Sequence, residues 1–473
     1  MSATGGEGPA SRVLNTIVNF GRNVSFQPQV HETPKSEAEV LDLLRRHRGQ
    51  RIRAYGSLHS WSRVATTNGV AVDVSQLNSI ELQTDGAFPT ARVGGGCQIK
   101  RLVVELNRQG WTLPSLGLIK EQTIAGATST ATHGSGRHCL SYYIQSMRIA
   151  TYDSKGEPVI REISQGRELE AARCGLGSLG IITSITLTIR PQYQIEEYLR
   201  LHPDLASVLA AEEQTPLQQF FLIPWSWAWF DQHRRESSAP RGRSAGLYRL
   251  FWSLGMDRAF HWIIVLLARM LPGRCTSFFY RRCMAMLIPQ NWHAVDRSDR
   301  QLTMQHQLFR HIETEIFVTR SNLEPMLSFT RWLLEWSEGN CDTQAEWTRK
   351  AGECGLLNDL DALAGQYQHH YPICVRKVLP DDGLLTMSGG GAEPWYAISF
   401  ISYAPPSKRA GFLLFSSLLI RLSGQLFNAR PHWGKARPSR LPDAHRLYPA
   451  LDEFLRLRDE IDPTGAFRQP ELT

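Results

Sequence analysis

A run of twelve small residues, "AGATSTATHGSG" (Ala125–Gly136), constrains the fold of this chain more than any other feature. His133 is the only member of the run larger than threonine, although apolar sequence flanks it. The run is too polar and too rich in glycine for a helix of the hydrophobic core. Its small side chains instead let backbone N–H groups approach a ligand closely. The run therefore predicts a cradle for a diphosphate-like anion, and a flexible surface linker is the alternative.

Strands and helices alternate through the first two hundred residues. Residues 35–49 predict a helix, because they open on a capping box at Ser36 and space their apolar residues along one face. Residues 51–55 and 69–75 alternate in polarity and predict half-buried strands, and residues 98–110 predict a second helix. This alternation indicates a mixed α/β or α+β domain.

The segment "AYGSLHSWS" (residues 54–62) holds a histidine, His59, in a tight loop directly after a predicted strand. Gly56 and Ser57 break the strand, so His59 lies on a turn rather than inside an element. Such a histidine is either a hydrogen-bonded bystander or a group that takes part in chemistry, and the loop alone does not choose between them.

A Gly-x-Gly-x-x-Gly match lies at Gly175, Gly177 and Gly180. In a Rossmann dinucleotide site this motif follows a strand and opens a helix. Here the helical pattern "GRELEAARC" precedes the glycines and the β-branched "IITSITLTI" follows them. The reversed order argues against a Rossmann site and predicts a tight helix-to-strand turn.

Composition narrows the class of protein. A chain of 473 residues with 42% hydrophobic and 21% charged residues has an ordinary globular balance. The eight cysteines include no Cys-x-x-Cys pair, so neither a zinc site nor a disulfide scaffold is indicated. The first residues hold no apolar core of signal-peptide length, which favours a cytoplasmic location. A net charge of +7 permits an acidic partner surface, and no nucleic-acid partner is expected.

Four segments occur in one order: "GSLHS", "LPSLGLIKEQTIAGATSTATHGSG", "AARCGLGSLGIITSITLTIRP" and "RPHWGK". Together they resemble the PCMH-type FAD-binding fold of the vanillyl-alcohol-oxidase superfamily, nearest to its aldonolactone oxidase and alditol oxidase branch. The likeness covers residues 18–195 and 370–473 and is weak between them.

The resemblance implies an α+β fold. It implies an FAD-binding domain of two subdomains over residues 18–195 and a substrate-binding cap domain with an antiparallel sheet over residues 196–425. The cap would carry a helical insertion near residues 244–290, and the C-terminal segment 426–473 would return to the FAD site.

The resemblance also implies FAD as the cofactor and His59 as the histidine that bonds covalently to the methyl group on the flavin's benzenoid edge. The family usually has glycine just before this histidine, whereas Leu58 stands here. The residues expected at the FAD are Tyr55, Gly56, Ser57, Leu58, His59, Ser60, Thr123, Gly126, Thr130, Ala131, Thr132, His133, Gly134, Ile181 and Ile182. This chemistry needs neither a metal nor a nicotinamide.

Three catalytic positions follow from the same resemblance. "PICVRKV" (Pro372–Val378) resembles a strand with a Glu-x-Arg pair that faces the substrate, so Arg376 is the expected arginine and Cys374 stands at the acidic position. A thiol is a weaker hydrogen-bond partner than a carboxylate, so a less polar substrate than a polyol is favoured. Cys374 itself is either a buried apolar cysteine or a reactive thiol. Lys435 matches a lysine near the flavin's pyrimidine end and the substrate oxygen.

The implied function is an FAD-dependent oxidoreductase. It would take hydride from a CH–OH group of a sugar, lactone or polyol-like substrate and pass the electrons to dioxygen or another acceptor. Arg376 and Lys435 would steady the substrate oxygen as its proton leaves. The alternatives are an oxidase of a lipid-linked or less polar alcohol, and a non-catalytic or membrane-associated flavoprotein.

The middle of the chain carries an unusual excess of positive charge. Residues 231–282 contain ten arginines against three acidic residues, a local balance of +7. Helical apolar spacing runs through the same segment, and its apolar run 262–267 is too short to span a bilayer. A basic, aromatic-rich helical pair either lies on an anionic membrane or packs on the cap with its arginines solvated.

Overall fold

The N-terminal half contains two small sheets, of which the first is parallel. The computed structural model describes residues 16–86, 88–270, 273–304, 310–341, 345–441, 443–469 and 472. Strands β3 (Val30–Glu32), β5 (Val70–Asp73) and β4 (Ile52–Tyr55) pair in that order, and α1 (Glu37–Arg46) connects β3 to β4. Ser36 caps α1 by accepting a hydrogen bond from the Glu39 N–H. The predicted helix and strands of this region are confirmed.

The second sheet of this half is antiparallel. Its five strands run in the order β10 (Pro158–Ile163), β9 (Ile144–Tyr152), β11 (Ile181–Thr188), β7 (Thr90–Gly94) and β6 (Ile80–Gln83). The helices of this part are α2 (Ile99–Arg108), α3 (Ile124–Ser129) and α4 (Gly166–Arg173), and two short strand pairs are β1 (Ile17–Val18) with β2 (Ser25–Phe26) and β8 (Trp111–Thr112) with β12 (Arg190–Pro191). The described residues before Gln194 thus form one three-stranded sheet, one five-stranded sheet and two strand pairs.

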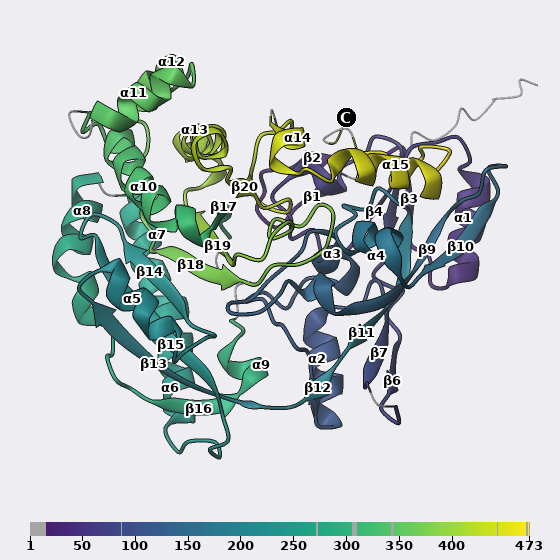
Figure 1. The fold of residues 1–473 in the computed structure, drawn as a ribbon, viewed down its shortest axis with the longest axis horizontal. Coiled ribbons are helices and arrows are strands. Elements are labelled where there is room, and N and C mark those ends of the chain that lie inside the picture. Colours follow the sequence, from purple (N-terminus) through teal and green to yellow (C-terminus); the bar gives the residue numbers. More distant parts are fainter. Residues whose placement is uncertain are drawn as a thin grey trace, which may run out of the picture.

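One antiparallel sheet dominates the rest of the chain (Figure 1). Its eight strands run in the order β16 (Ala294–Arg297), β13 (Gln194–His202), β15 (Ala228–Ser237), β14 (Gln219–Ile223), β18 (Ile373–Val378), β19 (Trp395–Ser402), β17 (Ile312–Thr319) and β20 (Arg430–Pro431). The other helices are α5 (Leu205–Glu212), α9 (Ser298–Gln301), α10 (Leu323–Glu338), α11 (Ala345–Glu353), α12 (Leu357–Leu363), α13 (Ala410–Phe427), α14 (Ala444–Leu447) and α15 (Leu451–Ile461). We call this sheet the cap sheet.

A helical insertion follows β15, as predicted. It consists of α6 (Ala245–Leu250), the π-helical η3 (Phe251–Phe260), α7 (His261–Met270), α8 (Gly273–Arg282) and the 3₁₀ turn η4 (Met284–Leu287). Two helices of the described residues are long and apolar enough to cross a membrane by length and composition alone: Ala245–Leu267 and Ala410–Phe427. The second packs against α10 and β17, as a core helix does. The apolar run 262–267 lies inside the first of these helices, because α6, η3 and α7 join into one continuous helix.

The charge excess counted along this segment is partly neutralised by acids outside it. Arg234 pairs with Glu197, and Arg235 pairs with Glu196. Arg241 and Arg249 both pair with Asp296, at 3.3 and 3.2 Å. Antiparallel pairing brings Glu196 and Glu197 of β13 to the arginines of β15. Asp296 of β16 meets Arg241 and Arg249, which come from the loop after β15 and from α6. The sum along the sequence therefore overstated the free charge.

The C-terminal segment joins both halves of the molecule. Strand β20 pairs with β17 at the edge of the cap sheet, and α15 packs against α4 of the N-terminal half. Phe467 enters the small core beneath the parallel sheet. Arg53 of β4 donates to the carbonyls of Gly177 and Phe467 and so links the N-terminal half to this segment.

Candidate active site

A cleft lies where the two halves meet, and side chains from both line it. Its volume is 1910 Å³ with the solvent at its mouth included. The cleft runs without a break from the loop after β4 to strand β18 of the cap sheet, so one hollow reaches both the residues expected at the FAD and the expected catalytic residues.

The N-terminal side of the cleft is built from three stretches of small residues. They are the loop after β4, the first turn of α3, and the turn between α4 and β11. Loop and helix meet so closely that a Cβ at Gly56 would lie 2.0 Å from Thr123 Oγ1. Thr123 in turn accepts the N–H of Gly126 and caps α3. Glycine at position 56 is therefore required by packing, and the backbone on this side stays open to a ligand.

Most of the residues expected at the FAD do line the cleft. They are Tyr55, Gly56, Ser57, Leu58, His59, Ser60, Thr123, Gly126, Thr130, Thr132, His133 and Ile182. Ala131, Gly134 and Ile181 are not among the lining residues. Successive side chains on β11 point to opposite faces, so Ile182 faces the cleft while Ile181 is buried with the core of α1 and the parallel sheet. A Cβ at Gly134 would meet the Leu116 carbonyl at 2.5 Å, which ties this glycine to a neighbouring loop instead.

The glycine motif at 175–180 forms the predicted helix-to-strand turn between α4 and β11. Gly177 and Gly180 have positive φ angles of 67° and 142°, which glycine adopts without strain. Leu176, Gly177 and Gly180 also line the cleft, a role that the motif's reversed context did not suggest.

His59 lies at the cleft with one nitrogen unpaired. Its ring stacks on Phe20, with centroids 4.7 Å apart, and among the described residues its buried Nδ1 has no hydrogen-bond partner. Burial lowers the pKa of His59 to about 4, and the charges of Lys100 and Lys435 add to this effect. The ring is therefore neutral at physiological pH and its Nδ1 is free to meet a group in the cleft.

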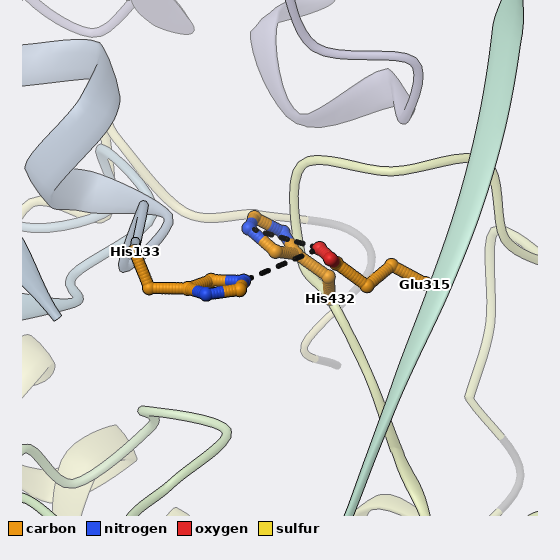
Figure 2. A group of neighbouring side chains, drawn as sticks. All are labelled: His133, Glu315 and His432. Atoms are coloured by element: carbon orange, nitrogen blue, oxygen red, sulfur yellow. Dashed lines mark ion pairs between the residues drawn. The ribbon is translucent and has the colours of Figure 1, made fainter. Parts of the chain in front are cut away.

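The cap side of the cleft carries two buried glutamates that the sequence did not reveal. Glu313 and Glu315 lie on β17, and alternation places both on the cleft face while Ile316 faces the opposite side. His133 Nε2 lies 3.5 Å and His432 Nε2 lies 3.9 Å from Glu315 Oε2 (Figure 2). The acidic alternation "IETEIF" was the available signal, but such a pattern normally indicates a solvated strand face.

Charge compensation keeps Glu315 ionised. Burial alone raises the pKa of this carboxyl, but Lys435 and His133 outweigh burial and hold the pKa well below its usual range. Burial lowers the pKa of His432 to about 3, so this ring is neutral. The Gly434 N–H donates to His432 Nδ1 at 2.9 Å, which leaves the ring proton on Nε2, toward the carboxylate. Ser399 also donates to Glu315, at 2.5 Å.

Arg376 and Cys374 both face the cleft from β18, two residues apart on one face. Arg376 Nε donates to Gln219 Oε1 at 3.0 Å, and its Nη1 lies 3.7 Å from Glu315 Oε1. Burial raises the pKa of the Cys374 thiol to about 11, so Cys374 is a neutral thiol rather than a nucleophile. Glu313 and Glu315 also supply carboxylates to the site, but each already lies against a cation, Lys435 or Arg376.

Lys435 brings the second cation to the same end of the cleft. Its Nζ lies 2.5 Å from Glu313 Oε2 and 4.8 Å from the centre of the Trp61 ring. The backbone N–H of Trp61 donates to the Gly434 carbonyl at 2.8 Å, and this hydrogen bond fixes the loop directly before Lys435. We call the group of Glu313, Glu315, Arg376 and Lys435 the charged end.

Phe221 of β14 lies opposite Cys374 of β18, and with it a largely apolar set of side chains lines the cleft; Gln219 and Gln232 are the polar side chains on the same strands. We call this part the apolar arm; its side chains come from the cap sheet, from the loops beside it and from the helical insertion. They are Phe221, Phe230, Trp252, Phe260, Met284, Met304, Tyr371 and Ile401.

Comparison with known proteins decides the family. An FAD binding domain family matches residues 28–159, and the D-arabinono-1,4-lactone oxidase family matches residues 187–473. The chain belongs to the D-arabinono-1,4-lactone oxidase family. A long-chain alcohol oxidase from an uncultured marine euryarchaeote is 49% identical to this chain, and the match covers 96% of each protein. The L-gulonolactone oxidase of Scyliorhinus torazame is 25% identical, with 95% of each chain covered.

The fold agrees with this membership. A cholesterol oxidase from Brevibacterium sterolicum matches with a TM-score of 0.73 over 96% of this chain and 95% of that chain, at 15% identity. The predicted PCMH-type α+β fold is confirmed. As a member of this family the protein is an FAD-dependent oxidoreductase that acts on CH–OH donors. The cleft fits FAD, since its small-residue side admits a dinucleotide and the buried Nδ1 of His59 lacks any other partner among the described residues.

Proposed function

We propose that this enzyme oxidises alcohols whose hydroxyl group ends a long apolar body, rather than sugar lactones or polyols. The observation that carries the proposal is the apolar arm, which leads from the charged end to the helical insertion. A polyol would bury hydroxyl groups against aromatic and methionine side chains there, and each hydroxyl left unpaired costs about 1–3 kcal/mol. An alkyl chain instead gains about 0.8 kcal/mol for each buried CH₂ group.

The two cations of the charged end serve the reaction. Arg376 and Lys435 line the cleft beside the carboxylates of β17, which hold them in position. As hydride leaves the carbinol carbon, the alcohol oxygen would give its proton to a carboxylate of Glu313 or Glu315, and the nearby positive charge would stabilise its alkoxide character. When bound, FAD supplies the hydride acceptor. Loss of one such donor typically lowers kcat by about 10²–10³-fold.

The relatives support the same substrate class. The relative at 49% identity bears the name long-chain alcohol oxidase, whereas the L-gulonolactone oxidase reaches 25% over a similar length. Cys374 supports it as well, since a neutral thiol in place of the family's carboxylate removes one acceptor for substrate hydroxyls.

We further propose that His59 would hold FAD covalently through Nδ1; the methyl group on the flavin's benzenoid edge would give up a proton, and dioxygen would take the two electrons that this coupling releases. The low pKa of His59, about 4, keeps the imidazole neutral, and a neutral ring nitrogen is the nucleophilic form. Its burial at the cleft without another hydrogen-bond partner among the described residues supports the same role.

A peripheral contact with an anionic membrane is also proposed, on an otherwise cytoplasmic protein. Fourteen large hydrophobic side chains are exposed among the described residues, and nine of them lie on the helical insertion. These nine are Leu247, Leu250, Leu254, Trp262, Ile263, Leu266, Met270, Phe278 and Leu287. Arg258, Arg281 and Arg282 are exposed on the same helices. Apolar and basic side chains on one surface suit the interface of an anionic bilayer, from which an amphiphilic alcohol partitions.

An anaerobic half-reaction tests the substrate class directly. The purified holoenzyme would be mixed without oxygen with primary alcohols of increasing chain length, with a polyol and with an aldonolactone, and flavin bleaching followed. We expect the bimolecular rate constant for bleaching to rise with chain length and to exceed that of the polyol and the lactone. Faster bleaching by the lactone or polyol than by every long-chain alcohol would contradict the proposal.

Position 374 offers a matched pair of variants for the same assay. Cys374→Glu returns a carboxylate to the cleft and should lower the ratio of alcohol to polyol rates by about 10-fold or more, since each hydrogen bond to a charged group contributes about 1.5–3 kcal/mol. Cys374→Ser adds no charge and should leave the ratio within about 3-fold of the wild type, because a hydroxyl is a weaker partner. Equal shifts in both variants would contradict the role assigned to the missing carboxylate.

A further inference from the structure

A second cluster of ligating side chains lies on the face of the cap sheet that points away from the cleft. His202 ends β13, and Asp231 and His233 lie on the neighbouring strand β15. Residues alternate across a strand, so Phe230 and Gln232 line the cleft while Asp231 and His233 occupy the opposite face. We call these three residues the back cluster.

The ligand atoms of the back cluster are close together and buried. His202 Nε2 lies 3.0 Å and His233 Nε2 lies 2.9 Å from Asp231 Oδ2. The Asp231 side chain is fully buried, and those of His202 and His233 are 8% and 4% exposed. Zinc-like ions hold nitrogen and oxygen ligands at about 2.0–2.1 Å, so two ligands at ~90–110° to each other lie about 2.9–3.4 Å apart. Both measured separations fall in this range.

The same atoms do not form hydrogen bonds. Among the described residues, neither Nε2 atom and neither oxygen of Asp231 has a hydrogen-bond partner, although the separations are short enough. A hydrogen bond requires the N–H bond to point at the acceptor. The Nε2–H direction of each imidazole therefore passes beside Asp231 Oδ2 rather than toward it. Imidazole nitrogens and a carboxylate oxygen adopt this arrangement when all of them bind one common atom that lies between them. A buried carboxylate without any hydrogen bond is otherwise costly.

We propose that the back cluster binds one divalent transition-metal ion of the zinc class, with His202 Nε2, His233 Nε2 and a carboxylate oxygen of Asp231 as ligands. Two imidazoles and one carboxylate suit such an ion and leave a position for water. The ion cross-links β13 to β15. It thereby stiffens the strand that carries Phe230 and Gln232 into the cleft, and it takes no part in hydride transfer because the sheet separates it from the charged end.

Metal analysis of the purified holoenzyme tests this site. After dialysis against metal-free buffer, the wild type should retain about one equivalent of zinc-class metal per chain. Asp231→Asn and His233→Gln should each retain at least ~10-fold less metal, because each removes one of the three ligands and even changes to the partners of ligands typically cost about 10–100-fold in metal affinity. His293→Gln is the matched control. His233 stacks on the Tyr198 ring with the ring centroids 4.6 Å apart, and His293 stacks on the same ring at 4.2 Å. His293 nevertheless lies outside the back cluster, and its side chain is 56% exposed. Its variant should keep the metal of the wild type.

A second measurement covers the case in which the Asp231 variant does not fold. Chelator-treated wild type would be titrated with Co²⁺ and with Zn²⁺, and His202→Gln, at the least buried ligand, would be titrated in parallel. We expect a cobalt ligand-field absorption and a higher Tm on zinc addition in the wild type, and weaker binding by about 10–100-fold in His202→Gln. The proposal is wrong if the wild type binds neither ion at micromolar concentration, or if the ligand variants keep the wild-type metal content, which would put the ion elsewhere, such as at His133, Glu315 and His432.

Discussion

At the scale of single residues, Leu58 has a backbone conformation that favours glycine. Its φ angle is 53°, in the left-handed region, where a residue with a side chain loses about 1–2 kcal/mol. The Phe20 N–H donates to the Leu58 carbonyl at 2.9 Å, and the Phe20 ring stacks on His59. Phe20 therefore holds the turn from outside, and the loop keeps the conformation that glycine would adopt without strain.

The covalent flavin is a prediction at this scale. In wild-type protein precipitated with acid, we expect the yellow colour to stay with the pellet, whereas His59→Ala should release FAD to the supernatant, because only a ring nitrogen can form the bond. Visible absorbance of both fractions measures the outcome.

Leu58→Gly is the matched control for this loop. It should keep the colour in the pellet and change the free energy of unfolding by less than about 1 kcal/mol, because relief of the left-handed strain and the entropy that glycine adds to the unfolded chain oppose each other. Wild-type FAD found in the supernatant would remove the special role of His59.

At the scale of elements, the helical insertion has two faces with different tasks. Trp252, Phe260 and Met284 point inward and form part of the apolar arm. Trp262 and Leu266 on the same long helix point outward and are 64% and 46% exposed. One element thus connects the surface proposed to touch lipid with the arm proposed to receive the substrate's apolar body.

Membrane docking is the prediction for this element. The wild type should float with anionic vesicles at low salt and less so at high salt, because screening weakens attraction between exposed charges. Trp262→Ser with Leu266→Ser should lower the partition coefficient by about 30-fold or more, since burial of each side chain is worth about 1.5–3 kcal/mol.

Leu413→Ser gives a control of equal exposure, since Leu413 on α13 is also 46% exposed. It should float like the wild type, and all three proteins should retain their flavin. Equal flotation of the double variant and the wild type would contradict the assigned surface.

At the scale of the whole molecule, the site exists only because distant segments meet. The loop of His59, the cap strands with Glu315 and Arg376, and the C-terminal loop with Lys435 all line one cleft. Further contacts hold the parts together. Glu37, at the start of α1, accepts hydrogen bonds from Arg148 of β9 and so ties the two N-terminal sheets to each other.

The acid sensitivity of this tie can be predicted. Arg148 lowers the pKa of Glu37 from 4.5 to about 2 against the opposing effect of burial. A carboxyl with a lowered folded-state pKa stabilises the fold above its unfolded pKa and loses this contribution as pH falls through the folded value. Glu37→Gln should therefore lower Tm at pH 7, and the difference from the wild type should shrink between pH 4.5 and about 2.

Thermal melts over this pH range, followed by flavin fluorescence, measure the effect. Glu162→Gln is the control, because Glu162 also pairs with Arg148, at 3.2 Å, but is 57% exposed. Exposed pairs contribute little, so this variant should follow the wild type. A Tm difference for Glu37→Gln that stays constant down to pH 2 would contradict the assignment.

Much of the N-terminal half was determined by the sequence alone. The capped helix α1, the strands β4 and β5, and the turn at Gly177 follow from propensity, capping and turn chemistry, which act over a few residues. The small-residue run likewise predicted an open cradle, and it lines the cleft at Thr130, Thr132 and His133. Local rules suffice where the determining contacts are local.

Only the tertiary structure decided which charges meet. The alternation of "RIRAY" suggested a half-buried strand, yet Arg53 is 3% exposed because the carbonyls of Gly177 and Phe467 receive its guanidinium. Glu315 reaches Arg376 only through the register of β17, β19 and β18, which pairs Glu315 with Ser399 and Ser399 with Cys374. Register and burial depend on contacts far apart in the sequence, so no local pattern could reveal that two acidic residues on a strand lie inside an active site.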